Sequence, residues 1–356
     1  MDQIIKGSQS LLFRNAPYLI SAGSVVGSKE AEGPLGKLFD MTNEDDLFGA
    51  ETWEEAESVM QKEACVLAIG KAHVNVEDIR YLFGGDLLRQ GIATSMGVEG
   101  LQIPMFGLYG ACSTSGEALA LAAMSAAAGY GRYMLAVTSS HFGSAEKEFR
   151  FPLGYASQRP LSAHWTVTGS GAFLVGAQGE LQNNEIQNKA IQEGTKKSHV
   201  RIAGVTVGKI VDYGLKDSQN MGACMAPAAM DTIVQNFTDM GRTEADYDRI
   251  ITGDLGYVGQ SILFDLVQAK GYDIREKHMD CGMTIYDQET QDTHAGGSGC
   301  GCAAVTLASY VLPKVEKGEW KRVLFVPTGA LMSTVSFNEG ASVPGIAHGI
   351  VIEHCG

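Results

Sequence analysis

Apolar segments of strand length alternate with helical segments along this chain, and the alternation occurs twice in the same order. The paired segments are 82–86 and 248–254, 117–128 and 302–315, 133–140 and 322–330, and 169–176 and 345–353. Strands that alternate with helices predict parallel sheets covered by helices. A repeated order indicates an internal duplication. We therefore predict an α/β fold with two similar halves, 1–185 and 198–356, joined by the polar stretch 182–197.

Composition excludes several classes of protein. The net charge of −14 leaves no basic surface for nucleic acid. No run approaches the length of apolar sequence that a membrane span needs, and the first residues do not resemble a signal peptide. The seven cysteines are scattered, which favours a reduced protein. Cys300 and Cys302 lack the spacing of a metal or redox pair, so we expect no metal and no cofactor.

Cys112 is the strongest candidate for a functional residue. An apolar run from residue 103 stops at Gly110, the cysteine follows, and the helix predicted at 117–128 begins soon after it. A thiol near a helix N-terminus is expected to have a lowered pKa, because the helix dipole stabilises the thiolate. A cysteine placed in this way can accept an acyl group. Alternatively, Cys112 lines a ligand pocket without covalent chemistry, or only fills space in a crowded turn.

Three further side chains stand where strands end. Asp86 and Asp254 each follow a glycine at the end of a predicted strand, and His141 follows the strand at 133–140. Binding pockets of open parallel sheets form at the carboxyl ends of the strands. The two aspartates would otherwise cap helices, and the histidine would otherwise be a structural residue.

Three features together carry a resemblance to a known superfamily. The Gly-Ala-Cys-Ser-Thr-Ser elbow at 110–115, the duplicated pattern and the glycine-rich segment 296–301 resemble the thiolase and ketoacyl-synthase superfamily. The resemblance covers nearly the whole chain. It implies a five-layered αβαβα fold, a homodimer, and a cysteine at the buried end of a cleft between the halves.

A narrower resemblance is carried by several blocks together. They are 21–23, 29–36, 85–88, 138–141, 146–152, 165–171 and 221–229. These blocks resemble the stage V sporulation protein AD family of spore-forming bacteria. The resemblance implies a protein that binds dipicolinic acid and takes part in its uptake into the developing spore. It also implies a pocket role for His199, peripheral attachment to the spore inner membrane, and partners among the membrane proteins of the stage V sporulation A operon.

The residues that would complete an enzyme of the superfamily are absent from the matching positions. Ketoacyl synthases of this type use a histidine where this chain has 253–256, and an asparagine where it has Ser298 and Gly299. We therefore predict a protein that is not an enzyme. The alternative is an acyltransferase or condensing enzyme that uses Cys112, with His141 or His294 as the base. A third possibility is a scaffold whose pocket is vestigial.

A dianionic aromatic ligand needs cations or backbone amides around its carboxylates. The helix that starts at Ser113 and the glycine-rich segment 296–301 offer amides, and Lys147, Arg150 and Arg159 are candidate cations. Calcium, which dipicolinate chelates, would bridge the ligand to an aspartate, although nothing in the sequence requires it. The predicted ligand-binding residues are Cys112, Asp86, His199, His141, Asp254, Ser113 and Gly299.

Overall fold

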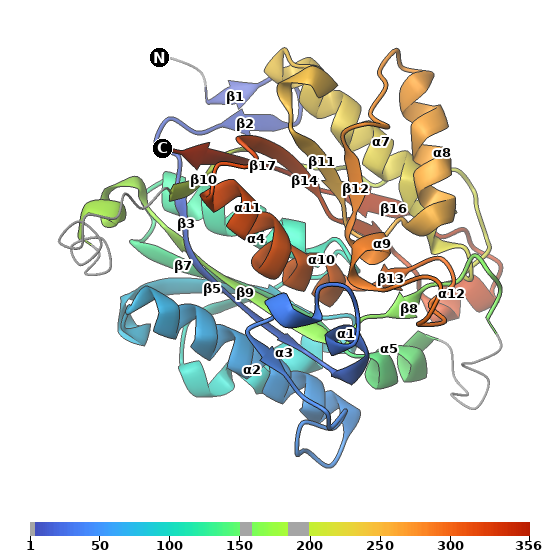
Figure 1. Cartoon of the computed structure of the whole chain (residues 1–356), viewed down its shortest axis with the longest axis horizontal. Helices are drawn as coiled ribbons and strands as arrows, with labels where there is room; N and C mark the ends of the chain where they lie inside the picture. The colour runs from blue at the N-terminus through green and yellow to red at the C-terminus, as the bar shows by residue number, and fades with distance from the viewer. Residues whose placement is uncertain (1–3, 150–158, 184–198) are drawn as a thin grey trace.

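The computed structural model describes residues 4–149, 159–183 and 199–356, and it arranges them in five layers. Two sheets alternate with three layers of helices, in the order α/β/α/β/α (Figure 1). This confirms the predicted five-layered α/β fold. The predicted boundary between the halves, at 185–198, falls outside the described residues.

The first sheet has five main strands. They are β3 (Tyr18–Val26), β5 (Ile79–Gly85), β6 (Met105–Gly107), β7 (Tyr133–Ser140) and β9 (Gly169–Gly176). Their order in the sheet is β6-β5-β7-β9-β3. The strands β5, β6 and β7 are parallel, whereas β9 is antiparallel to both of its neighbours. The carboxyl ends of the parallel strands therefore meet at one edge, where Asp86 and His141 follow.

The second sheet repeats this plan. Its strands are β10 (His199–Thr206), β11 (Arg249–Thr252), β12 (His278–Asp280), β14 (Arg322–Val326) and β17 (Gly349–Cys355). They lie in the order β12-β11-β14-β17-β10, with the same pattern of parallel and antiparallel pairs. Counted along the chain, each set of five has its third strand at one edge and its first at the other. A short pairing of β10 with β3 joins the two sheets.

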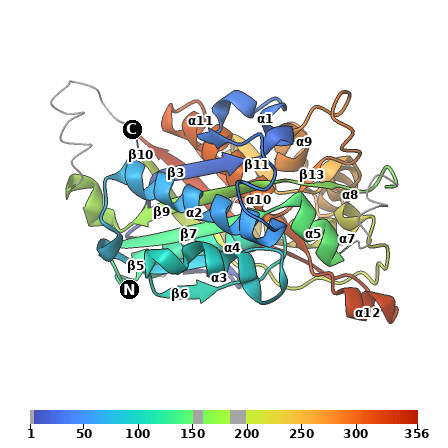
Figure 2. The same ribbon diagram turned by 90° about the horizontal axis from the view of Figure 1, so that it is seen from below.

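Each sheet has an outer layer of helices, and a third layer lies between the sheets (Figures 1 and 2). The outer helices are α2 (Trp53–Ala72) and α3 (Ile92–Val98) on one side, and α7 (Met221–Met240) and α8 (Gly256–Gln268) on the other. The middle layer holds α4 (Thr114–Ala127) and α10 (Cys300–Thr306), which continues through a π turn into α11 (Leu312–Glu316). None of the helices in the described ranges has the length and apolar character needed to cross a membrane.

Short elements complete the chain. They are β1 (Ile5–Lys6), β2 (Ser10–Leu12), α1 (Ser28–Ala31), β4 (Met41–Thr42), α5 (Phe142–Phe149), β8 (Trp165–Thr166), α9 (Cys281–Ile285), β13 (Gly297–Ser298), β15 (Thr328–Ala330), α12 (Thr334–Asn338) and β16 (Gly345–Ala347). Several of them lie where the two halves meet, and β8 of the first half pairs with β13 of the second.

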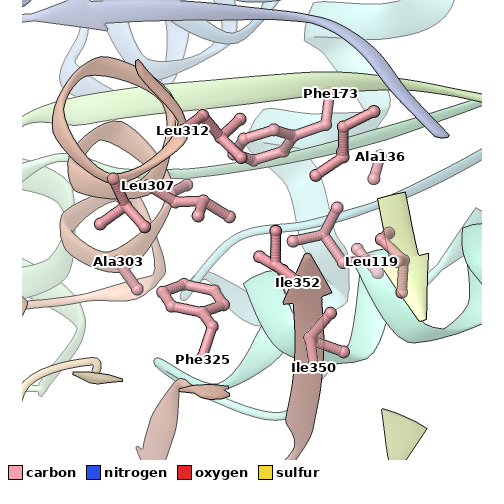
Figure 3. Close-up of a cluster of buried hydrophobic side chains, with 14 of the residues drawn as sticks. Leu119, Ala136, Phe173, Ala303, Leu307, Leu312, Phe325, Ile350 and Ile352 are labelled. Carbon is pink, nitrogen blue, oxygen red and sulfur yellow. The ribbon is translucent and has the colours of Figure 1, made fainter. Parts of the chain in front are cut away.

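The core lies between the two sheets. Figure 3 shows Leu119 of α4 and Phe325 of β14 among the side chains that gather there, and both are fully buried. Small residues of α4 and α10 bring helix and sheet close together: a methyl group on Gly171 would come within 2.7 Å of Ala304. Each large side chain buried here contributes about 1.5–3 kcal/mol to stability.

Most predicted elements have counterparts, with two informative differences. The sequence favours a helix at 66–71 that follows an acidic stretch at 51–57. In the structure, 66–71 is only the end of α2, which begins at Trp53 and is capped by Thr52, whose side chain accepts from the amide of Glu55 at 3.2 Å. Two of the acidic residues therefore form the first turn of the helix, where the helix dipole favours them. Strand β3 was not predicted, because its serine, alanine and glycine residues interrupt the apolar pattern.

Candidate functional site around Cys112

Cys112 lies in a tight elbow between β6 and α4. Ala111 has a φ of 49°, a left-handed conformation that costs a residue with a side chain about 1–2 kcal/mol. The hydroxyl of Ser113 donates to the carbonyl of Gly110 at 2.7 Å, and the hydroxyl of Thr114 donates to the carbonyl of Ala111 at 2.6 Å. These bonds hold the elbow closed and leave Cys112 only 6% exposed.

Asp254 brings the second half of the chain against this elbow. It follows β11, and its carboxyl group accepts a hydrogen bond from the thiol of Cys112. The same carboxyl accepts from the hydroxyl of Thr328 at 2.8 Å and from the amide of Gly299 at 3.0 Å. The structure therefore brings three of the predicted site residues, Cys112, Asp254 and Gly299, together at a single buried carboxyl group.

The thiol is held in its neutral form. Burial, followed by the neighbouring Asp254 carboxylate, raises the pKa of Cys112 well above its usual value. Burial also raises the pKa of Asp254 to about 7. The expectation of a lowered thiol pKa is therefore wrong. The dipole of α4 acts on the cysteine, but desolvation and a nearby acid outweigh it.

Gly299 is required at its position by space and by backbone conformation. Its φ is 106°, and a methyl group there would lie 2.4 Å from the hydroxyl oxygen of Ser140. That hydroxyl accepts from the amide of Gly301 at 3.2 Å and donates to the carbonyl of Val167 at 2.7 Å. The start of α10 is thereby fixed against the end of β7.

A small apolar cluster separates Cys112 from solvent. Leu87, Ala145 and Cys300 are buried with Cys112, and Phe149 packs against them from the outside. The thiol of Cys300 donates to a backbone carbonyl of β7 at 2.9 Å, so it is fixed in place. We call these five residues the Cys112 cluster.

A cavity of about 450 Å³ lies against the outer side of this cluster and shares Leu87 and Phe149 with it. Its polar lining includes Arg89, Tyr109 and Glu148. The guanidinium of Arg89 pairs with the carboxylate of Glu148 at 2.6 Å and remains 61% exposed. Arg89 was not among the predicted cations, although it lies three residues after Asp86, which the sequence analysis singled out.

Asp86 accepts hydrogen bonds from its own turn and from the first turn of α3. One oxygen of its carboxyl accepts from the amide of Leu88 at 2.8 Å, and the other accepts from the amide of Thr94 at 2.8 Å and from its hydroxyl at 2.6 Å. Burial raises its pKa, and the nearby acid Glu57 has a pKa raised to about 8. Its contacts are those of a structural residue that steadies the start of α3, whose N-cap position is Gly91.

The predicted histidines do not touch the Cys112 thiol. His141 accepts from the amide of Gly143 at 3.0 Å through Nδ1, so the proton sits on Nε2 and bonds the carbonyl of Asp46 at 2.7 Å. Burial lowers the pKa of His141. Nε2 of His294 lies 3.1 Å from the carboxylate of Asp292 in the same loop, and its Nδ1 lies 2.9 Å from the carbonyl of Pro160. Both side chains have structural partners.

His199 lies at the far end of a strand. It begins β10, where its ring meets the edge of Tyr18 at 6.2 Å. The other end of β10, at Thr206, pairs with Gly349 of β17, the strand that contacts α4. Seven residues of strand span roughly 23 Å. The structure therefore places His199 apart from the residues that gather at Cys112.

The predicted cations are also engaged elsewhere. Lys147 pairs with the carboxylate of Glu54 at 3.1 Å. Arg159 donates to the backbone carbonyl of Asp292 at 2.9 Å. Arg150 lies outside the described residues. Neither of the two that are described lines the cavity beside the Cys112 cluster.

Besides Arg89, the sequence analysis missed Asp280, a structural residue that positions the site. Asp280, at the end of β12, accepts from the hydroxyl of Thr252 at 2.6 Å and from the amides of Leu255 at 2.9 Å and Met283 at 3.1 Å. It caps α9 and fixes the turn that carries Asp254. The sequence held a signal for this role, because an aspartate directly before a short helix is typical of an N-cap.

The geometry gives little support for a metal ion. No group of three or more histidine, cysteine or acidic side chains that could hold one occurs in the part of the chain that the structure describes. The carboxyl oxygens of Asp86 and Asp254 already accept hydrogen bonds from amides and hydroxyls. Calcium would have to displace those donors.

Comparison with solved structures identifies the fold. A variant of OleA from Xanthomonas campestris superposes with a TM-score of 0.58 at 13% identity, over 96% of this chain and 99% of that chain. The 3-oxoacyl-[acyl-carrier-protein] synthase III of Aquifex aeolicus VF5 gives a TM-score of 0.53 at 13% identity, over 95% and 99%. The predicted thiolase-like fold of condensing enzymes is therefore confirmed.

Sequence comparison identifies the family. The family model for stage V sporulation protein AD (SpoVAD) matches residues 7–353. Stage V sporulation protein AD of Bacillus subtilis (strain 168) is 40% identical over 352 residues, which cover 99% of this chain and 98% of that protein. Both matches span the two halves and the Cys112 elbow, so this chain belongs to the stage V sporulation protein AD family.

Proposed function

We propose that this sporulation protein binds dipicolinate without catalysing acyl transfer, and that it serves the uptake of dipicolinate into the developing spore. The observation that supports the absence of catalysis is the buried pair of Cys112 and Asp254. Acyl transfer needs a thiolate as nucleophile. It also needs hydrogen-bond donors where negative charge develops, and the Asp254 carboxyl opposes such charge.

The cavity beside the Cys112 cluster suits a small aromatic dicarboxylate. Its volume of about 450 Å³ is within the range of small-ligand sites. Leu87, Leu88 and Phe149 offer apolar surface for a flat ring, and Arg89 offers a fork of donors for a carboxylate. The hydroxyl of Thr334, which accepts from Arg89 at 3.1 Å, lies beside that fork. In this proposal the ligand competes with Glu148 for Arg89.

A calorimetric titration with dipicolinate, with and without calcium, tests the proposal. Arg89→Gln is expected to weaken binding by at least tenfold, because a charge-assisted hydrogen bond contributes about 1.5–3 kcal/mol. Arg275→Gln, an exposed arginine beside α8, is the matched control and should bind as the parent does. Unchanged affinity in Arg89→Gln would show that dipicolinate binds elsewhere. Absence of binding to the parent protein would favour the scaffold alternative.

The alternative enzyme function is tested separately. Its support is the fold shared with condensing enzymes. The pure protein would be incubated with acyl-CoA and then with iodoacetamide, and Cys112 would be followed by mass spectrometry. We expect neither acylation nor turnover. Turnover that disappears in Cys112→Ala would establish the enzyme and refute the non-catalytic proposal.

The cellular setting is also proposed. We infer that the protein attaches peripherally to the spore inner membrane through the membrane proteins of its operon. Recovery in the membrane fraction of spore lysates, and release when those partners are deleted, would support this. Full recovery in the supernatant of lysates with intact partners would contradict it.

We further propose a homodimer. Strand β6 is an edge of the first sheet, and Phe106 on it is 53% exposed, which is typical of a strand that pairs with another copy. Sedimentation of the parent should show a dimer. Phe106→Glu should shift it towards the monomer, and a monomeric parent would refute the proposal.

A further inference from the structure

A second cavity, of about 320 Å³, lies apart from the Cys112 cluster, between α1, the start of α2, the start of α5 and β8. Figure 1 shows α1, α5 and β8 in the same region of the molecule. Its lining combines the rings of two tryptophans and a phenylalanine with an amine, two carboxyl groups and the imidazole of His141; the second carboxyl is that of Asp46. The lining residues that carry the argument are Lys29, Glu30, Trp53, Phe142 and Trp165.

The aromatic walls are fixed by their packing. The rings of Phe142 and Trp165 stack with centroids 4.0 Å apart and an interplanar angle of 12°. Arg159 lies 4.6 Å from the centroid of Trp165 and holds that ring further. On the other side, a methyl group on Gly143 would come within 2.6 Å of the Trp53 ring, so this glycine allows the indole to lie against α5.

The carboxyl group of Glu30 is buried and only half satisfied. It is 1% exposed, and Oε1 accepts from the amide of Thr168 at 3.0 Å and from the hydroxyl of Tyr286. Oε2 has no hydrogen-bond partner among the described residues other than the backbone amide of Glu30 itself. That amide favours the charged form of the carboxyl group. A buried acceptor without a donor is costly, and a ligand that donates to it would remove that cost.

Lys29 supplies the opposite charge at the same cavity. Its ammonium lies 4.4 Å from the centroid of the Trp165 ring. Burial lowers the pKa of Lys29, so a ligand carboxylate would find a partly desolvated cation there. The charge of Glu30 acts in the opposite sense and raises the pKa of Lys29, so the two charges interact beside the same cavity.

We propose that this cavity binds a free α-amino acid with an apolar side chain. The ligand ammonium donates to Oε2 of Glu30, the ligand carboxylate accepts from Lys29, and the apolar side chain packs on the rings of Trp53 and Phe142. The site does not depend on the proposed dipicolinate site, because the two cavities share no lining residue.

Saturation-transfer NMR and tryptophan fluorescence on the full-length protein test this inference, with L-leucine and L-phenylalanine as probes. Two of the three tryptophans line the cavity, so fluorescence should change on binding. The fragment 3-methylbutylamine lacks the carboxylate of leucine, and 4-methylpentanoate lacks its ammonium. Each fragment is expected to bind at least tenfold more weakly than leucine. Equal binding of either fragment, or no binding of both amino acids, would overturn the inference.

Matched variants test the residues. Lys29→Met and Glu30→Gln should each weaken leucine binding at least tenfold, while the exposed neighbours in Lys37→Met and Glu32→Gln should leave it unchanged. Melting temperatures would verify that each variant is folded. Because Lys29 is only half-buried, Lys29→Met should fold, and it can test the site even if Glu30→Gln unfolds. Retained leucine affinity in folded Lys29→Met would overturn the inference. Dipicolinate affinity should be unchanged in Lys29→Met, and its loss would assign this cavity to dicarboxylates instead.

A pH series gives a readout that a purely structural role would not move. Burial raises the pKa of Glu30 to about 7, and only the ionised carboxylate pairs with the ligand ammonium. Leucine affinity should therefore fall about tenfold from pH 8 to pH 6 in the parent protein. Where Glu30→Gln retains measurable binding, its affinity should be flat over that range. A flat profile in the parent would contradict the ammonium–Glu30 contact.

Discussion

Replacing Asp254 by asparagine should stabilise the protein more at pH 8 than at pH 5. The carboxyl is fully buried, and burial raises its pKa from 3.8 to about 7. The folded protein therefore holds this proton more tightly than the unfolded chain does. The stability that the group contributes is fully present below about pH 4 and is lost as the pH rises through about 7.

The magnitude follows from the difference between the two pKa values. At about 1.4 kcal/mol for each pH unit, the raised pKa of Asp254 costs the fold about 4 kcal/mol at pH 8, where the carboxyl is ionised. At pH 5 it costs about 2 kcal/mol, because folding must then place a proton on a carboxyl that is ionised in the unfolded chain. Asparagine does not titrate, so Asp254→Asn avoids this cost. Its stability relative to the parent should therefore increase by about 2–3 kcal/mol between pH 5 and pH 8. A constant penalty from altered hydrogen bonds to Thr328 and Gly299 cancels in that comparison.

Urea unfolding at pH 5, 6.5 and 8 measures this effect. Asp265→Asn, whose side chain is 81% exposed on α8, is the control and should show no such pH dependence. If the stability difference between Asp254→Asn and the parent were the same at all three pH values, Asp254 would not carry a raised pKa. The account of the neutral Cys112 thiol would then lose its main support.

Further substitutions test the packing and the thiol. Alkylation of Cys112 by iodoacetamide, mapped by mass spectrometry, should be slow in the parent and faster in Asp254→Asn, because a neighbouring carboxylate that raises the thiol pKa is gone; equal rates would contradict this. Gly299→Ala should lower the free energy of unfolding by roughly 1–3 kcal/mol, because residue 299 has a positive φ and its new methyl group would meet Ser140. A variant as stable as the parent would refute this close approach. Phe325→Ala should cost about 3–5 kcal/mol in urea unfolding, and a loss below about 1 kcal/mol would place Phe325 outside the core.

The elements with strong local signals were predicted from the sequence. Strands β7 and β9 were predicted at their observed bounds, because their apolar residues are continuous and glycines or polar residues bound them. Strand β3 was not, because its stability comes from pairing with β9 and from packing against α2 rather than from its own composition. Pairing between distant segments leaves little trace in a single sequence.

The candidate site was predicted in part. The elbow, the aspartates at strand ends and the glycine before α10 are local features, so Cys112, Asp254 and Gly299 could be named. Arg89 could not be assigned to the cavity, because its neighbours include Thr334 from the other half of the chain. The second cavity could not be predicted either, because in it Glu30 meets residues from α2, α5 and β8, which lie far from it along the chain.

The sequence by itself determined the duplicated α/β plan, the nucleophile-like elbow and the family. These features follow from the order of the segments and from short motifs, which are local properties of the chain. Only the tertiary structure decided the state of the cysteine. A helix N-terminus favours a thiolate, and this is all that the residues around Cys112 could indicate. The fold removes water from the thiol and brings the carboxyl of Asp254 against it from the second half, and together these outweigh the dipole.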